Sequence, residues 1–322
     1  MLEAIKNFPR QFTYRPIIKN KKNYKKAKRF ILLGMGGSHL AADLINNWED
    51  TSNFILIHKN YGLPNIPDKE LGQHLIIASS YSGNTEEVVD GLKKALQKKY
   101  KIIVIATGGK LIALAKKYKL PYIQMPATGI QPRSALGFSC RALLKAIGQP
   151  RALKETASLA QKLKPAKYQK RGQKIAKQLK NYLPVIYSSD RNISLAYNWK
   201  IKLNETGKIP AFYNVFPELN HNEMNGFDPV DQTKKLSRPF YFIFLQDDYD
   251  HTKVINRMAV LSKMYRQKGL PVQSIKLNGA NKWLRIFSNL LLADWVAYYT
   301  ALNYKTNPEQ VPMVEKFKKL IK

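Results

Sequence analysis

Short continuous runs of apolar residues recur along this chain, and a turn rich in glycine or hydroxyl residues follows several of them. Such runs occur at residues 30–33, 54–57, 75–78 and 102–105. They are apolar throughout, as strands buried on both faces of a parallel sheet are. Between them lie segments with the spacing of amphipathic helices, residues 39–47, 85–97 and 110–118. This alternation predicts an α/β fold, a doubly wound and mainly parallel sheet flanked by helices.

The same alternation resumes after a helical, lysine-rich stretch at residues 148–180, which Pro150 and Pro165 interrupt. Further strands are expected at residues 183–187, 239–245 and 272–275. Further helices are expected from about residue 193, over 252–267 and over 282–302. A length of 322 residues also suits two domains of ordinary size. The sequence therefore predicts two related α/β domains, 1–150 and 151–322, the second of which ends in a C-terminal helix.

The charge of the chain raises the question of a polyanionic partner. Lys and Arg number 54 against 22 Asp and Glu, a formal net charge of +32. Such a charge is typical of proteins that bind nucleic acid or anionic membranes. The most basic run, residues 19–29, has neither a recognition-helix pattern nor a zinc or helix-turn-helix signature. We therefore expect no nucleic-acid or membrane partner, and we interpret the charge as a solvated surface that attracts anionic substrates.

The compartment is suggested by three further features. Cys140 is the only cysteine, so no internal disulfide can form, which is typical of a reducing compartment. Residues 1–16 lack the continuous apolar core of a secretory signal. The apolar stretch 290–302 contains Asp294 and is shorter than the roughly 20 residues that span a bilayer. We expect a cytoplasmic protein.

Two of the predicted strands end in residues that suit an anion. In this fold class ligands collect at the carboxyl ends of strands, where backbone N–H groups and helix N-termini face them. The first end offers two glycines and a serine, which suit an ordinary turn and helix cap equally well. The second offers more hydroxyls than one helix cap needs, which favours phosphate. Neither loop has the lysine of a Walker A loop or the third glycine of a dinucleotide fingerprint. The predicted phosphate-binding residues are Gly36, Gly37, Ser38, Ser80, Ser82 and Thr85.

The pairing of Gly-Met-Gly-Gly-Ser at 34–38 with Ser-Tyr-Ser-Gly-Asn-Thr-Glu-Glu at 80–87 resembles the sugar isomerase (SIS) domain, which binds phosphosugars. Further stretches resemble the bifunctional phosphoglucose/phosphomannose isomerases of archaea and some bacteria, namely 60–64, 131–138, 202–208 and 218–223. The resemblance implies two SIS domains and no cofactor. It also implies that glucose 6-phosphate and mannose 6-phosphate are interconverted with fructose 6-phosphate, by ring opening and a cis-enediol, in glycolysis and gluconeogenesis.

That chemistry needs a base between C1 and C2, groups that open the sugar ring, and a cation for the enediolate. The resemblance assigns the base to Glu205, ring opening to His221 and Lys318, and the cation to Arg133. Judged by spacing alone, Glu205 would be a surface residue paired with a nearby lysine. His221 is a candidate even without the resemblance, because polar residues surround it and an imidazole can transfer protons near pH 7. No second His or Cys lies at ligand spacing from His221, so we expect no metal.

The resemblance further implies a homodimer in which His221 completes the neighbouring site. Lys316 and Lys319 compete with Lys318 for the role of the terminal lysine. Residues 307–311 depart from the pattern of the family, which leaves the preference between the two epimers open. The alternative to an isomerase is a non-catalytic SIS module that senses phosphosugars, in association with nucleic acid.

Overall fold

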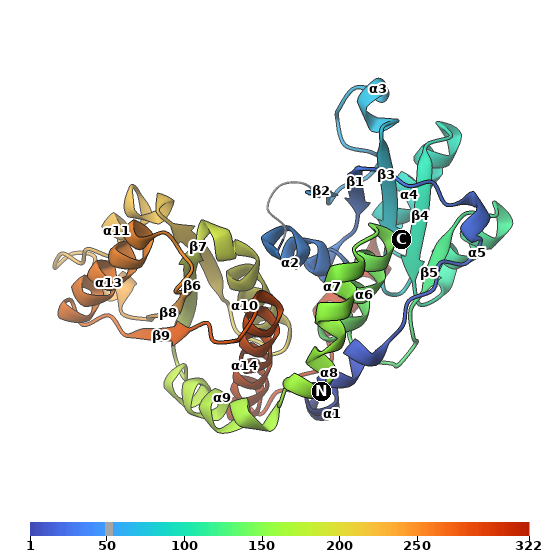
Figure 1. The fold of residues 1–322 in the computed structure, drawn as a ribbon. Helices are drawn as coiled ribbons and strands as arrows, with labels where there is room; N and C mark the ends of the chain where they lie inside the picture. The colour runs from blue at the N-terminus through green and yellow to red at the C-terminus, as the bar shows by residue number, and fades with distance from the viewer. Residues whose placement is uncertain (49–53, 322) are drawn as a thin grey trace. The chain divides into compact units, whose positions relative to one another are not determined.

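The structure, a computed structural model, describes residues 1–48 and 54–321. The chain divides into two compact units. The N-terminal unit is Lys6–Leu163, and the C-terminal unit is Lys164–Lys322 together with Met1–Ile5. Figure 1 shows the helices and strands of each unit, and Lys322 lies outside the described residues.

These compact units differ from the predicted domains, 1–150 and 151–322. The helices α7 (Pro150–Ala157) and α8 (Leu159–Lys162) both contact the 3-10 helix η1 (Phe8–Thr13), and these contacts hold them in the N-terminal unit. As a division into independent domains, the boundary at residue 150 stays a prediction.

Five parallel strands form the sheet of the N-terminal unit, in the order β2-β1-β3-β4-β5. They are β1 (Arg29–Leu33), β2 (Ile55–His58), β3 (His74–Ser79), β4 (Lys101–Ala106) and β5 (Tyr122–Gln124). One face of the sheet shares an apolar core with α4 (Glu86–Gln97) and α5 (Gly109–Lys117). The helices α2 (Leu40–Trp48) and α6 (Leu136–Ala146) contact each other and the sheet, and the short helix α3 is Asp68–Leu71.

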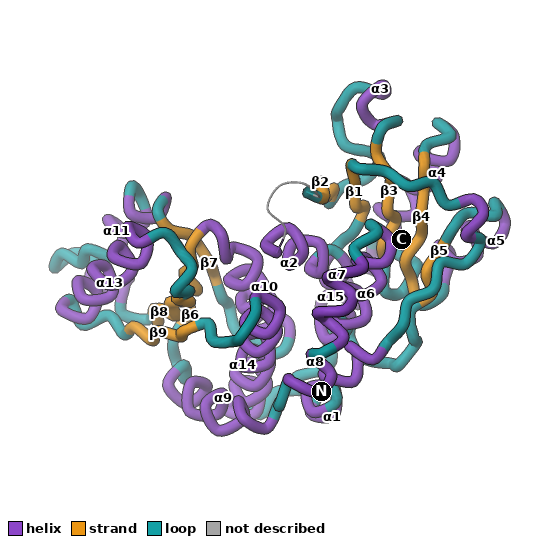
Figure 2. Tube along the Cα trace, in the orientation of Figure 1, coloured by secondary structure: helices purple, strands orange, loops and turns teal. Residues whose placement is uncertain are grey.

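Four parallel strands form the sheet of the C-terminal unit, in the order β7-β6-β8-β9. They are β6 (Leu183–Ser189), β7 (Phe212–Phe216), β8 (Phe240–Gln246) and β9 (Val272–Lys276). The helices are α9 (Ala166–Gln178), α10 (Ile193–Glu205), α11 (Glu223–Gly226), α12 (Lys234–Ser237), α13 (Thr252–Gln267), α14 (Lys282–Asn303) and α15 (Pro312–Leu320), with α1 (Leu2–Lys6) at the start of the chain. In both units helices flank the strands (Figure 2), which confirms the predicted fold class.

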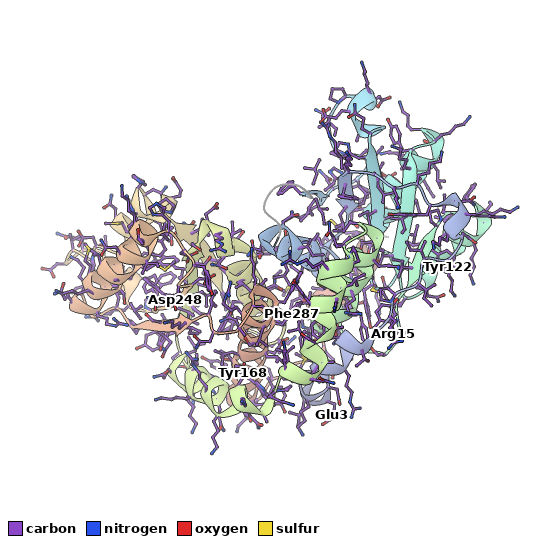
Figure 3. The ribbon with its side chains drawn as sticks, viewed as in Figure 1. Glu3, Arg15, Tyr122, Tyr168, Asp248 and Phe287 are labelled. Carbon is purple, nitrogen blue, oxygen red and sulfur yellow. The ribbon has the colours of Figure 1, made fainter. Side chains whose placement is uncertain are left out.

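The apolar stretch near the end of the chain is part of α14, a core helix. Its aromatic residues pack internally: the rings of Trp283 and Phe287 stack 6.1 Å apart, and Figure 3 labels Phe287. Asp294 forms an ion pair of 2.5 Å with Lys202 of α10, and both side chains are at most 5% exposed. Of the helices in the described part of the chain, none is both long and apolar enough to span a membrane.

Most predicted elements are present, with ends shifted by a residue or two. The structure adds two strands, β5 and β7, and four short helices, α1, α3, α11 and α12. Both added strands lie at an edge of their sheet.

Candidate functional site

The two predicted phosphate loops lie side by side in the N-terminal unit. Each follows a strand, β1 or β3, and these strands are parallel neighbours that pair up to Leu33 and Ala78. Ser38 joins the loops, because its Oγ accepts a hydrogen bond of 2.9 Å from the backbone N–H of Tyr81. Gly36 begins the 3-10 helix η3 (Gly36–Ser38) at a φ of +50°, a conformation that favours glycine. The two turns therefore form one continuous surface at the carboxyl edge of the sheet.

The hydroxyls after β3 divide into those that shape the loop and those that can reach a ligand. Ser80 is fully buried, and its Oγ lies 2.7 Å from Thr85 Oγ1 and accepts the N–H of Gly83 at 3.1 Å. Ser82 is exposed, and its Oγ accepts the N–H of Asn84 at 3.2 Å. The hydroxyls of Ser80 and Thr85 thus bond within the loop, whereas that of Ser82 is the exposed one and Thr85 is half-buried.

Gly83 shows why this loop tolerates no larger residue. Its φ is +74°, and a Cβ there would lie 1.9 Å from the carbonyl oxygen of Gly108. Its own carbonyl accepts the N–H of Leu111 at 2.9 Å, which ties the loop to α5. The glycine therefore allows the loop to fold tightly against the turn after β4.

Arg133 belongs to the same surface. It lies in the 3-10 helix η4 (Pro132–Ser134) and is only 2% exposed, which is unusual for an arginine. A Cβ on Gly37 would lie 2.9 Å from the backbone nitrogen of Arg133, so the two turns are in direct contact. Gln131 Oε1 lies 3.5 Å from Arg133 Nη1. The structure thus brings Arg133 together with the predicted phosphate loops.

Glu205 is the last residue of α10 in the C-terminal unit and is half-buried. The residues around it hold the end of this helix. Lys202 is paired with Asp294, and Asn204 Nδ2 donates to the carbonyl oxygen of Ile209 at 3.0 Å. Lys208 Nζ donates to the main-chain oxygen of Glu205 at 2.6 Å and to that of Gln310. Lys208 therefore fixes the backbone at Glu205, and Lys202 anchors α10 to α14, roles that their spacing did not predict.

His221 is exposed and follows the 3-10 helix η6 (Glu218–Asn220), which comes after β7. The helix α10 connects β6 to the parallel strand β7, so Glu205 precedes β7 and His221 follows it. At about 3.3 Å per residue, a strand of this length separates its two ends by roughly 16 Å. Within the C-terminal unit, Glu205 therefore lies near the amino ends of the parallel strands, and His221 lies near their carboxyl ends.

Lys318 lies in α15, and its Nζ forms an exposed ion pair of 3.1 Å with Glu315 in the same helix. This contact does not join Lys318 to any other predicted site residue. Lys316 and Lys319 are exposed on the same helix, so burial does not distinguish among the three lysines.

The other histidines have structural partners. His39 Nδ1 lies 2.7 Å from Asp43, and His74 Nδ1 lies 2.8 Å from the carbonyl oxygen of Glu70. His251 accepts the N–H of Lys253 and so caps α13. Over residues 1–48 and 54–321, no group of three or more His, Cys, Asp or Glu is placed to hold a metal ion.

Comparison with known proteins gives matches over both units. A family model described as the bacterial phospho-glucose isomerase C-terminal SIS domain matches residues 168–321. The bifunctional phosphoglucose/phosphomannose isomerase of Caldicellulosiruptor bescii is 32% identical to this chain, and the alignment covers 98% of this chain and 97% of that protein. The protein of the same name from Aquifex aeolicus is 29% identical, with 99% and 98% covered.

Solved structures show a similar fold. The crystal structure of tagatose-6-phosphate ketose/aldose isomerase from Escherichia coli matches with a TM-score of 0.63 and 17% identity. The match covers 95% of this chain and 93% of that one. The present chain, with its two parallel sheets, therefore shares the fold of that isomerase.

Proposed function

We propose that this chain, which belongs to the bifunctional phosphoglucose/phosphomannose isomerase family, interconverts glucose 6-phosphate and mannose 6-phosphate with fructose 6-phosphate. The observation that carries the proposal is the contact between the turn that holds the buried Arg133 and the glycine-serine turn after β1. A regulator that only senses phosphosugars is not favoured, because the relatives matched over nearly full length are named isomerases.

The N-terminal unit supplies the binding of the charged groups. Backbone N–H groups of the loops after β1 and β3, with the hydroxyls of Ser82 and Thr85, face the phosphate, and the N-terminus of α4 favours its charge. Arg133 keeps its positive charge at every physiological pH, so it stabilises the enediolate oxygen without a proton transfer. Most of the surface charge has no part in these steps, although it raises the rate at which a dianion reaches the protein.

Glu205 transfers the proton between the carbons. Its carboxylate takes the proton from C2 of the open-chain aldose, and the C–H electron pair forms the C1–C2 double bond of the enediol. The same carboxyl group then delivers the proton to C1 while C2 becomes the carbonyl carbon. The C1 carbonyl electron pair moves to O1, and the hydroxyl proton of O2 is transferred to O1. The reaction is therefore balanced without an oxidant. Lys208 holds the backbone from which this carboxylate projects, and Lys202 anchors the same helix to α14.

His221 opens the ring by proton transfer at the ring oxygen and the C1 hydroxyl. Glu205 and His221 lie near opposite ends of the strands of one sheet. A site that uses both residues therefore takes His221 from a second copy of the chain. The exposure of His221 supports this arrangement, and the assembly is accordingly a homodimer. Lys318 assists ring opening. The cytoplasmic location and the place in glycolysis and gluconeogenesis stay predictions.

The first variant tests whether Glu205 is the base. Glu205→Gln removes the base but keeps the size of the side chain, so the formation of fructose 6-phosphate slows by about 10²–10⁴-fold at little change in KM. A coupled assay with a chelator present measures this rate. A Glu205→Gln enzyme with wild-type turnover would show that the base is another residue.

Mixing Glu205→Gln and His221→Ala proteins then tests the dimer. If each site combines residues from two chains, a mixed dimer contains one intact site, and an equimolar mixture regains about a quarter of the wild-type rate. The control is each variant incubated with itself under the same exchange conditions. A mixture as inactive as its parents, with mixed dimers present by native mass spectrometry, would place both residues in one chain's own site.

A further inference from the structure

Glu223 is a carboxylate that the proposed mechanism does not use, and it lies two residues after His221. Its Oε1 accepts a hydrogen bond of 2.5 Å from the hydroxyl of Tyr187, which projects from β6. Its Oε2 accepts a hydrogen bond from Nδ2 of Asn214, which projects from β7. One carboxylate therefore connects the segment after β7 to two neighbouring strands of the sheet.

Tyr187 is a rigid anchor for this carboxylate. It is fully buried, and its ring contacts those of Phe216, Phe242 and Phe244 with centroids 5.4–6.0 Å away. Burial raises the pKa of the Tyr187 phenol well above its ordinary value, so the hydroxyl remains a donor at every physiological pH. An ionised acceptor makes a stronger hydrogen bond with such a donor than a neutral acceptor does.

The residues on either side of His221 also form hydrogen bonds within the C-terminal unit. Asn222 Oδ1 accepts the N–H of Glu223 at 2.5 Å, and its Nδ2 donates to Glu218 at 2.8 Å. Asn220 Oδ1 accepts from Arg257 of α13 at 3.3 Å. In the Asn-His-Asn-Glu sequence three side chains thus hold the segment, while the imidazole of His221 is exposed.

We propose that Glu223 is a positioning residue that fixes the backbone of His221 so that the imidazole projects toward a second copy of the chain. This inference rests on the proposed function, because it requires His221 to act in ring opening. Glu223 itself touches no substrate. Its effect comes from holding a short exposed segment in one conformation, and a misplacement of about 1 Å in such a group can cost about 10²-fold in rate.

The first test changes the polarity of the network. Glu223→Gln places an amide N–H group against the amide of Asn214, so it lowers kcat for glucose 6-phosphate about tenfold and leaves KM nearly unchanged. The double variant Glu223→Gln with Asn214→Asp reverses donor and acceptor, and it restores kcat to within about threefold of wild type. Asp228→Asn, which neutralises an exposed carboxylate just beyond α11, is the matched control and keeps the wild-type rate.

The second test separates positioning from general destabilisation. In a His221→Ala background, Glu223→Gln has no further effect on kcat, because no imidazole remains to be misplaced. A further tenfold loss in that background, or no recovery in the double variant despite a wild-type melting temperature, would overturn the positioning role. Full activity of His221→Ala alone would overturn the proposed role of His221 as well, so the two failures are distinguishable.

Discussion

The carboxyl edges of the two sheets are equivalent in topology and opposite in chemistry. In each sheet two adjacent parallel strands, β1 and β3 or β6 and β8, end at the point where the strand order reverses. Ligands of open α/β sheets bind at such points. In the N-terminal unit glycines and hydroxyls follow the strands, whereas aspartates and an asparagine follow them in the C-terminal unit.

At the corresponding edge of the C-terminal sheet, buried polar side chains form hydrogen bonds with one another. Asn192 Nδ2 donates to Ser189, Asp250 and Asp247 at 3.1–3.3 Å, and Ser189 Oγ donates to Asp250 at 2.7 Å. Arg285 lies 3.8 Å from Asp247. Figure 3 labels Asp248 in the same loop. The two carboxylates disfavour a phosphate at this cluster, so we expect the phosphate at the carboxyl edge of the N-terminal sheet.

Among the variants that test this comparison, Gly83→Ala is expected to reduce kcat/KM the most. The new Cβ meets the carbonyl of Gly108 at a φ that L residues rarely adopt, so the phosphate loop cannot keep its shape. We expect kcat/KM for glucose 6-phosphate to fall about 100-fold, because a displaced loop loses several phosphate contacts at once. Steady-state kinetics measures the loss, and thermal unfolding shows whether the fold is retained.

The control for Gly83→Ala is Gly108→Ala in the facing turn. A Cβ on Gly108 meets nothing within 4 Å, and its backbone is extended, so wild-type kinetics are expected. Equal losses in the two variants would mean that the conformation of this loop does not govern phosphate binding.

A smaller effect is expected from Gly37→Ala, which tests the contact between the turns. The Cβ would lie 2.9 Å from backbone atoms of Pro132 and Arg133, so one of the turns has to move. We expect kcat/KM to fall about tenfold, mainly through kcat, because Arg133 is displaced from the enediolate oxygen. Gly72→Ala serves as the control, since its Cβ has ordinary contacts only. A loss confined to KM would assign the turn to phosphate binding alone.

The sequence predicted all of the central strands and two of the edge strands, β2 and β9. Residues such as those of β3 and β8 are buried along nearly their whole length, so their apolar runs are continuous. The strands that it missed, β5 and β7, lie at sheet edges. β5 has only three residues, and β7 contains the polar Asn214, whose partner Glu223 is known only from the fold. β5 is therefore too short, and β7 too polar at Asn214, to show the continuous apolar run that marks the central strands.

The site was predictable to the extent that its signal is local. A cluster of hydroxyls before a helix indicates an anion loop, and that inference requires only neighbouring residues. The burial of Arg133 depends on packing against a turn that is distant in sequence. Likewise, spacing predicts Lys202 as a partner for Glu205, yet the carboxylate that Lys202 contacts, Asp294, is 92 residues away. Composition could not reveal which of these charges are buried.

The smallest expected effect concerns Asp250 at the C-terminal sheet, and it is a change in how the free energy of unfolding depends on pH. Burial raises the pKa of Asp250, Asp247 adds repulsion, and the hydrogen bond from Ser189 opposes both. A carboxyl whose pKa is raised by folding binds its proton more tightly when folded, so its contribution to stability declines as pH rises from about 3.8 through the folded pKa.

Asp250→Asn removes this titration and keeps an oxygen that can accept from Ser189 and Asn192. The free energy of unfolding should therefore decline less between pH 4 and pH 7 than in the wild type, as urea unfolding can measure, with KM for phosphosugars unchanged. Asp248→Asn, at an exposed ion pair with Lys276, is the control and should alter the slope little. A rise in KM with Asp250→Asn would contradict the contrast between the two edges, because it would make the acidic edge a part of the binding site.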